Sequence, residues 1–357
     1  MSRRRAPRAA AAGLALLVLV AVALPFVPSS RAGAGGVGQA TEAVLLTRAS
    51  SSPVDGLETG VLHVPDLGGG AHEVRVGVVH PEGEPVADVL FVHGHADRLD
   101  NHAALFAGLR GAGVRVISFD LPSHGLTDAG PIDVWTSDDL ADLVARVERA
   151  TADGDRPLVL AGWSFGGLVA TRIAQDEAQT AAFSRPLAGL VLEVPAIAPR
   201  PAAGGDGISR LRALTHDPHA PVAGPPRPAS PLLDPVFAGR LLTQAAIAAA
   251  TPLPRDLPTL VELSDPAEDL YVDVDAVERW ALGIARDDGA RPRVMRCDGG
   301  RHGLDLEAWP IGAGARLDLV EFVVDVAVGV DPRGEGQDAS VSAASPPPDE
   351  AVRGACR

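Results

Sequence analysis

Between about residues 40 and 330, short apolar runs alternate with longer stretches in which apolar side chains recur every three or four residues. Residues 73–80 alternate between apolar and polar side chains, which predicts a strand. A continuous apolar run predicts a buried strand at 89–93, and short, mainly apolar runs predict further strands at 114–120, 158–162, 187–194, 259–264 and 293–297. Helical spacing predicts helices over 99–110, 137–150, 165–179, 274–285 and 317–328. This alternation predicts an α/β fold in which helices cover both faces of a parallel sheet.

The segment from about 195 to 257 interrupts this alternation. It is rich in Pro and Gly and contains one stretch of helical spacing, at about 236–250. Plain connections between core strands are rarely so long, so we predict a cap or lid over the edge of the sheet where ligands bind. A surface insertion without regular structure is the alternative.

The two ends of the chain differ in composition from the part between them. Arginines at the start, an apolar run over 9–24 and small residues at 32–34 give residues 1–34 the layout of a secretory signal peptide, with an uncleaved N-terminal anchor as the alternative. Residues 331–357 are rich in Asp, Gly, Ser and Pro and are predicted to form a disordered tail. The predicted folded domain spans 40–330, in a secreted or extracytoplasmic protein.

The chain carries a net charge of −15. A body this acidic repels phosphate backbones, which excludes nucleic acid as a partner and leaves membrane association to the N-terminal segment alone. Cys297 and Cys356 are too few for a disulfide framework or a zinc cluster. They form either one bridge, in an oxidising compartment, or two unpaired thiols.

Residues 162–167 read Gly-Trp-Ser-Phe-Gly-Gly and lie between a predicted strand and a predicted helix. This is the G-x-S-x-G pattern in the setting that it needs, a tight strand-to-helix turn that holds a serine above the sheet. The glycines leave room where a Cβ would clash, and the helix N-terminus favours negative charge that develops nearby. We therefore predict that Ser164 is a nucleophile.

A serine nucleophile needs a base and an acid, which can follow it along the chain in the order Ser, Asp or Glu, His. His302 lies in a glycine-flanked loop directly after the last predicted strand and suits the base. The acid belongs in the loop after the strand at 259–264, where four carboxylates compete. Asp269 fits best, because the apolar Leu-Tyr-Val that follows it would pack the loop back. The alternatives are Asp265, Glu268 and Asp273, the last a candidate helix N-cap.

An oxyanion intermediate requires two N–H donors. The backbone N–H of Phe165, directly after Ser164, is one candidate, and that of His95, in the loop after the strand at 89–93, is the other. We expect the imidazoles of His93 and His95 to pack the loop rather than to take a chemical step. No cluster of side chains has metal-ligand spacing, so we predict neither a metal nor another cofactor.

Over about 85–325 the sequence resembles the α/β-hydrolase superfamily, and within it the monoacylglycerol lipase and lysophospholipase group, often labelled serine aminopeptidase-like. Five blocks carry the resemblance in the right order, at 89–95, 113–125, 162–167, 269–273 and 300–302. The resemblance implies an α/β-hydrolase fold with a mostly parallel eight-stranded sheet and a cap insertion. It also implies a triad of Ser164, Asp269 and His302, with an oxyanion hole at His95 and Phe165.

Together these features predict a secreted serine hydrolase that cleaves carboxylic esters of small molecules or lipids through an acyl-enzyme. An aminopeptidase or amidase on the same triad is the alternative. It would need an acid in the insertion to hold a substrate amine, and Asp206, Asp217 and Asp234 lie there. A non-catalytic binding protein on this fold is a third hypothesis. A dehalogenase or epoxide hydrolase would need Asp in place of Ser164.

Overall fold

The computed structural model describes residues 43–200, 210–222, 235–283, 292–329 and 350–357. The predicted signal peptide or anchor, 1–34, lies outside the described residues, as do two parts of the predicted cap, 201–209 and 223–234. In the described part of the chain, no helix has the length and apolar character that crossing a membrane requires.

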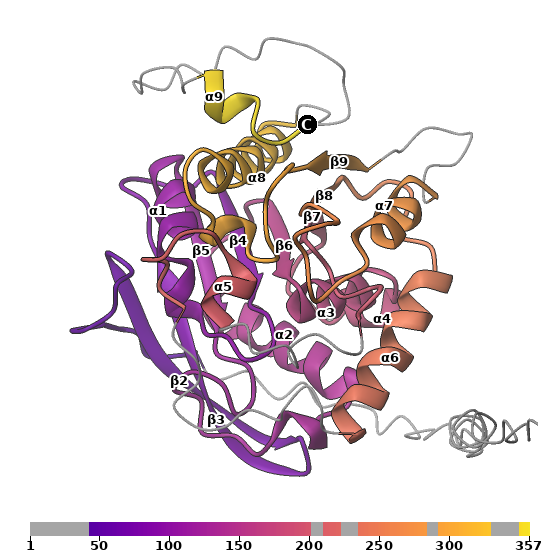
Figure 1. Cartoon of the computed structure of the whole chain (residues 1–357). Coiled ribbons are helices and arrows are strands. Elements are labelled where there is room, and N and C mark those ends of the chain that lie inside the picture. The colour runs from indigo at the N-terminus through magenta and orange to yellow at the C-terminus, as the bar shows by residue number, and fades with distance from the viewer. Residues whose placement is uncertain (1–42, 201–209, 223–234, 284–291, 330–349) are drawn as a thin grey trace, which may run out of the picture. The chain divides into compact units, whose positions relative to one another are not determined.

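Within the described residues, nine strands form one sheet in the order β1-β2-β3-β5-β4-β6-β7-β8-β9 (Figure 1). Their bounds are Thr47–Arg48, Leu57–Leu67, Gly70–Val79, Ala87–Val92, Val114–Phe119, Leu158–Trp163, Leu187–Glu193, Thr259–Leu263 and Arg293–Arg296, for β1 to β9. Strands β1, β2 and β3 pair antiparallel, as do β3 and β5. From β5 across to β9 all neighbours run parallel, which confirms the mostly parallel sheet.

The prediction of eight strands is wrong by one. The residue patterns placed β3 to β9 but neither β1 nor β2; β1 has only two residues and lies at the edge of the sheet, beside β2. Both of its residues are exposed, so no periodic burial marks it in the sequence. By contrast, β4, β5 and β6 are buried along their whole length, which explains why apolar residues dominate their sequences.

Helices cover both faces of the sheet (Figure 1). The core on one face includes side chains of α1 (Ala103–Gly111) and α8 (Ile311–Ala327). The core on the other face includes those of α2 (Ser137–Thr151), α3 (Phe165–Ala174) and α7 (Val274–Gly283). The remaining helices and 3₁₀ turns are η1 Leu99–His102, η2 Ile132–Val134, α4 Glu177–Thr180, α5 Arg210–Leu214, α6 Pro235–Ala250, η3 Leu304–Leu306 and α9 Glu350–Arg353.

The helix predicted over 165–179 is two helices. Helix α3 ends at Ala174, and α4 begins at Glu177. The side chain of Asp176 accepts the backbone N–H groups of Ala178 at 2.9 Å and Gln179 at 3.3 Å. This N-cap starts a new helix, because it satisfies N–H groups that a continuous helix would have bonded to the preceding turn.

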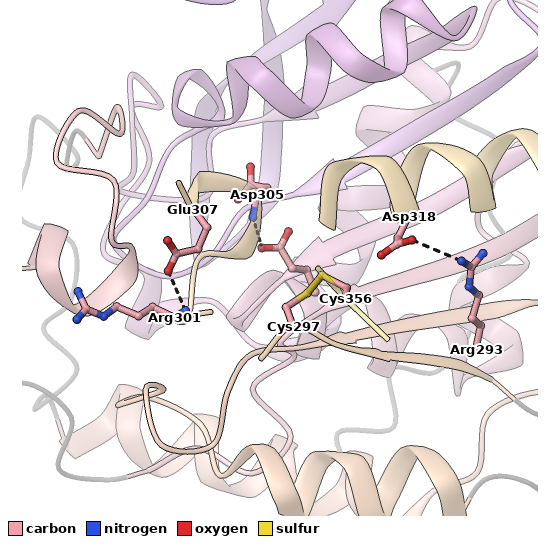
Figure 2. The surroundings of a disulfide bond; sticks show 8 residues. Arg293, Cys297, Arg301, Asp305, Glu307, Asp318 and Cys356 are labelled. Atoms are coloured by element: carbon pink, nitrogen blue, oxygen red, sulfur yellow. Dashed lines mark hydrogen bonds and ion pairs between the residues drawn. A yellow bond between two sulfur atoms is a disulfide. The ribbon is translucent and has the colours of Figure 1, made fainter. Parts of the chain in front are cut away.

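The end of the chain is tied to the sheet. Residues 331–349 of the predicted disordered tail lie outside the described residues, but 350–357 hold α9 and a disulfide between Cys356 and Cys297 (Figure 2). Arg296 and Arg357 exchange two backbone hydrogen bonds, of 2.8 and 2.9 Å, beside it. The prediction of disorder is therefore wrong for 350–357. Burial of the two cysteines and of Val352 outweighs the polar composition there.

Candidate active site

Ser164 lies at the sharp turn between β6 and α3. Its φ of 53° and ψ of −115° are a strained backbone conformation, and its N–H donates to the carbonyl of Glu193 at 2.9 Å. A Cβ at Gly162 would lie 2.4 Å from the carbonyl oxygen of Gly166, and one at Gly166 would lie 2.0 Å from that of Val92. Glycine is thus required on both sides of the turn, which holds Ser164 at the N-terminus of α3.

The structure brings Ser164, His302 and Asp269 together. Nε2 of His302 lies 2.8 Å from Oγ of Ser164, and Nδ1 lies 2.9 Å from Oδ2 of Asp269. Because Nδ1–H donates to the carboxylate, Nε2 is the nitrogen that accepts the serine proton. The indole N–H of Trp163 donates to the carbonyl of His302 at 2.8 Å and fixes the backbone of its loop. This arrangement allows a serine to lose its proton as it attacks.

Asp269 is a fully buried carboxylate with four hydrogen bonds. Besides His302, its oxygens accept the hydroxyl of Ser264 at 2.6 Å and the N–H groups of Tyr271 and Val272 at 2.7 and 2.9 Å. Burial alone would raise the pKa of Asp269, but the neighbouring imidazole of His302 and these hydrogen bonds hold that pKa below its usual value. The carboxylate is therefore ionised where it faces the imidazole.

The three alternative acids have other partners. Asp265 accepts two backbone N–H groups, at 2.9 and 2.8 Å, which hold its own loop against residues 298–300. Glu268 forms an ion pair of 3.3 Å with Arg301. Asp273 accepts an N–H group in the first turn of α7, as an N-cap does.

Both predicted oxyanion donors, His95 and Phe165, line the pocket that also contains Ser164. Phe165 is the first residue of α3, where a backbone N–H has no acceptor within the helix. The loop of His95 passes close to Ser164, since a Cβ at Gly94 would lie 2.8 Å from the ring of Trp163 and 3.3 Å from Cβ of Ser164. Both donors therefore lie on segments that adjoin the serine.

Two buried neutral histidines hold the His95 loop. Nε2 of His93 accepts the N–H of Leu121 at 3.0 Å, and Nε2 of His124 accepts that of Ala96 at 2.8 Å. Each ring donates from Nδ1 to a backbone carbonyl. Burial lowers the pKa of His93 to about 4 and that of His124 to about 3, so both rings are uncharged at neutral pH. His93 thus packs its loop, as we expected.

A pocket of about 170 Å³ opens beside Ser164, and its walls are mainly apolar. Helix α6 supplies Phe237, whose ring centroid lies 4.4 Å from that of His95 and 5.4 Å from that of Phe165. Leu241 of the same helix also lines the pocket. The described parts of the predicted cap, 195–200, 210–222 and 235–257, thus contribute side chains to this pocket.

The segment after α5 is anchored to the loop of His302. The N–H of Gly303 donates to the carbonyl of Leu214 at 2.9 Å. Glu307 accepts the N–H groups of Arg301 and His216, each at 2.9 Å (Figure 2 shows the first). The sequence analysis did not identify Glu307 as a residue that holds these two segments together. Its position shortly after His302, the predicted base, was the available signal.

Two arginines give the pocket its charge. Nη1 of Arg200 donates to the carbonyl of Asp269 at 2.6 Å, and Arg210 lies 3.7 Å from the buried carboxylate of Asp97. None of the described residues that line the pocket is acidic. Nor does the described part of the chain hold a group of three or more His, Cys, Asp or Glu side chains arranged to bind a metal ion.

Comparisons with known proteins agree with this architecture. The family model described as "Alpha/beta hydrolase family" matches residues 89–346. A comparison with curated proteins found no match. Among solved structures, the chain is similar to a lipase in its open form, with 20% identity and a TM-score of 0.58 over 75% of this chain and 99% of that one. It is also similar to the monoacylglycerol lipase of Paleococcus ferrophilus, with 18% identity and a TM-score of 0.56 over 71% of this chain and 99% of that one. A carboxyl esterase of Bacillus coagulans in complex with glycerol has 16% identity and a TM-score of 0.53, over 75% and 99% of the two chains. At these identities the likeness shows the fold.

Proposed function

This chain belongs to the alpha/beta hydrolase family, and from that premise we propose that it is a serine hydrolase that cleaves carboxylic esters through an acyl-enzyme. One observation carries the proposal, namely the continuous hydrogen bonding from Asp269 through His302 to Oγ of Ser164. A buried carboxylate, an imidazole with a fixed tautomer and a strained serine at a helix N-terminus are together suited to nucleophilic acyl transfer.

In the first half-reaction, Oγ of Ser164 bonds to the acyl carbon while its proton passes to Nε2 of His302. The carboxylate of Asp269 stabilises the imidazolium that results. The backbone N–H groups of Phe165 and His95 hold the negative charge that develops on the carbonyl oxygen. When the tetrahedral intermediate collapses, the bond to the alcohol oxygen breaks, and His302 gives its proton to the leaving alcohol.

In the second half-reaction, water takes the place of the alcohol. His302 removes a proton from the water as its oxygen bonds to the acyl carbon of the ester on Ser164. The same two N–H groups hold the oxyanion again. Collapse of this intermediate releases the carboxylic acid, and the proton on His302 returns to Oγ of Ser164, so that the enzyme is regenerated.

The pocket favours esters of short acyl chains. Its volume of about 170 Å³ is below the roughly 300–1,000 Å³ of sites that enclose drug-sized ligands. Its apolar walls suit a hydrocarbon chain. An aminopeptidase would need an acid to hold the substrate amine, but the charged groups of the described lining are Arg200 and Arg210. Asp217 is not among the lining residues, and Asp206 and Asp234 lie outside the described residues.

We place the mature enzyme outside the cytoplasm. The signal-peptide layout of residues 1–34 supports this location. The disulfide between Cys297 and Cys356 supports it too, because such bonds persist in oxidising compartments. The N-terminus of the exported protein tests the proposal: we expect it to begin after residue 34. An intact N-terminus in the membrane fraction would instead support the anchor, and a cytosolic protein with reduced cysteines would contradict export.

Ester turnover by the purified protein tests the function. We expect hydrolysis of p-nitrophenyl butyrate, slower hydrolysis of the palmitate and no cleavage of aminoacyl anilides. His302→Gln should lower kcat by at least about 10³-fold, since it removes the base. His219→Gln, at an exposed position outside the pocket lining, is the matched control and should leave kcat unchanged. Full activity of His302→Gln, or anilide cleavage without ester cleavage, would contradict the proposal.

A further inference from the structure

A buried histidine outside the predicted triad, His102, joins two loops of the active site. It lies where η1 meets α1, and its side chain is fully buried. Its Nε2 lies 2.7 Å from Oδ2 of Asp97, and its Nδ1 lies 2.7 Å from Oδ2 of Asp305. Asp97 belongs to the loop of His95, and Asp305 belongs to the loop of His302. One imidazole therefore spans the segments that carry an oxyanion donor and the base.

The bridge is an imidazolium between two carboxylates. A neutral imidazole has one N–H, so its second nitrogen would face a carboxylate lone pair with its own lone pair. Burial alone would lower the pKa of His102, but the carboxylates of Asp305 and Asp97 together raise it well above its ordinary value. Burial alone would raise the pKa of Asp97, but the charge on His102 and its hydrogen bond lower it. The two short distances are those of charge-assisted hydrogen bonds.

Both ends of the bridge are attached to further parts of the site. Asp97 also accepts the side-chain amide of Asn101, at 2.5 Å. The backbone N–H of Asp305 donates to Oε1 of Glu193 at 3.1 Å (Figure 2). The carbonyl of Glu193 in turn accepts the N–H of Ser164 at 2.9 Å. Loss of the bridge would therefore free the loop of Asp97 from the loop of Asp305, whose contacts reach Ser164 through Glu193.

Aromatic rings enclose the imidazole of His102. The ring centroids of Phe91, Trp163 and Phe106 lie 4.6, 5.7 and 6.1 Å from its own. These rings exclude water and keep the imidazole in one orientation, so that its two N–H groups point to fixed places.

We propose that His102 is a positioning residue that fixes the loop of His95 relative to the loop of His302. It touches no reacting atom, and the inference rests on the proposed serine-hydrolase function. A loop that carries an oxyanion donor affects the transition state more than the bound ester, because the charge develops only during reaction. Loss of the bridge should therefore lower kcat and leave KM nearly unchanged.

Substitutions of Asp305 cut the bridge at one end. Asp305→Ala leaves His102 paired with Asp97, so no buried charge is left without a partner. It also retains the backbone N–H at 305. Asp305→Asn keeps a side-chain oxygen that can accept the hydrogen bond from His102. Asp88→Ala is the matched control. Asp88 is an equally buried carboxylate that pairs with Arg115, Arg156 and Arg185, at the other end of β4.

Each variant is assayed for kcat and KM with p-nitrophenyl butyrate at a temperature where near-ultraviolet circular dichroism shows it folded. For Asp305→Ala we expect kcat to fall by about 10- to 100-fold with KM within about threefold of wild type. Asp305→Asn should recover most of that loss. Asp88→Ala should melt at a lower temperature with kcat unchanged. If Asp305→Ala does not fold, His102→Gln, which reaches only one of the two carboxylates, should show the same lowered kcat.

Three results would overturn the inference. They are unchanged kcat in Asp305→Ala, a loss in Asp305→Asn as large as in Asp305→Ala, and a loss in Asp88→Ala that matches the loss in Asp305→Ala. The first result would show that the link between the loops does not affect kcat. The second would show that the hydrogen bond from His102 does not restore kcat. The third would show that loss of any buried carboxylate lowers kcat to the same degree. Turnover by the wild type tests the proposed function separately, because an inactive wild type would refute that function. The inference about His102 depends instead on the ratios of kcat between the variants and the wild type.

Discussion

Removal of the disulfide should destabilise the whole domain. The bond joins Cys297 to Cys356 across a sequence separation of 59 residues. In the chain-entropy treatment, closing a loop of that length removes enough freedom from the unfolded chain to stabilise the fold by about 4 kcal/mol at 25 °C. Cys297→Ala combined with Cys356→Ala should lower the free energy of unfolding by about that amount, because the unfolded chain regains the freedom that the bond removes.

Urea unfolding followed by circular dichroism measures this change, with and without dithiothreitol. Reductant should bring the wild type down to the stability of the double variant and should leave the double variant unchanged. The variant without cysteines is therefore its own control for other effects of the reductant. If the free energies of unfolding of wild type and variant differed by less than about 1 kcal/mol, this explanation would be wrong, since closure of the loop would then stabilise the fold very little.

Three further substitutions test other parts of the structure. Asp269→Asn should lower kcat for p-nitrophenyl butyrate by roughly 10⁴-fold, because an amide favours the wrong tautomer of the base, whereas Asp265→Asn should leave kcat near that of wild type. Asp318→Asn should stabilise the protein above pH 6 by up to about 3 kcal/mol, because burial raises the pKa of Asp318 from 3.8 to about 6. The carboxyl therefore destabilises the fold only when it is ionised. In urea titrations at a series of pH values, the gain in the free energy of unfolding of Asp318→Asn should vanish below pH 4. Gly166→Ala should abolish soluble expression, since its Cβ would lie 2.0 Å from a backbone oxygen, whereas Gly239→Ala, which has nothing within 4 Å, should express normally.

The central fold could be predicted because its strands are buried on both faces. Apolar residues then dominate strands such as β4 and β6, and a helical pattern separates most of them. The edge of the sheet could not be predicted in this way. Only part of β2 alternates in burial, and β1 is too short for any pattern to appear. The end of helix α3 was missed because one capping side chain, Asp176, outweighs continued helical spacing.

The site could be predicted where a local pattern has one physical meaning. A serine between glycines at a strand-to-helix turn is such a pattern, and it pointed to Ser164. The loop at 265–273 holds four carboxylates, and sequence alone does not say which one faces His302. The bridge at His102 gives no local signal, because Asp305 lies about two hundred positions away in the chain and only the fold brings it close. The pairing of Cys297 with Cys356 was left open for the same reason.

Covalent labelling shows whether Ser164 is the nucleophile that we propose. The wild-type protein and Ser164→Ala are treated with an alkyl fluorophosphonate, and the modified peptide is identified by mass spectrometry. We expect one adduct, on Oγ of Ser164, that forms in the wild type and is absent from the variant. Equal labelling of the two proteins, or an adduct on another residue, would contradict it.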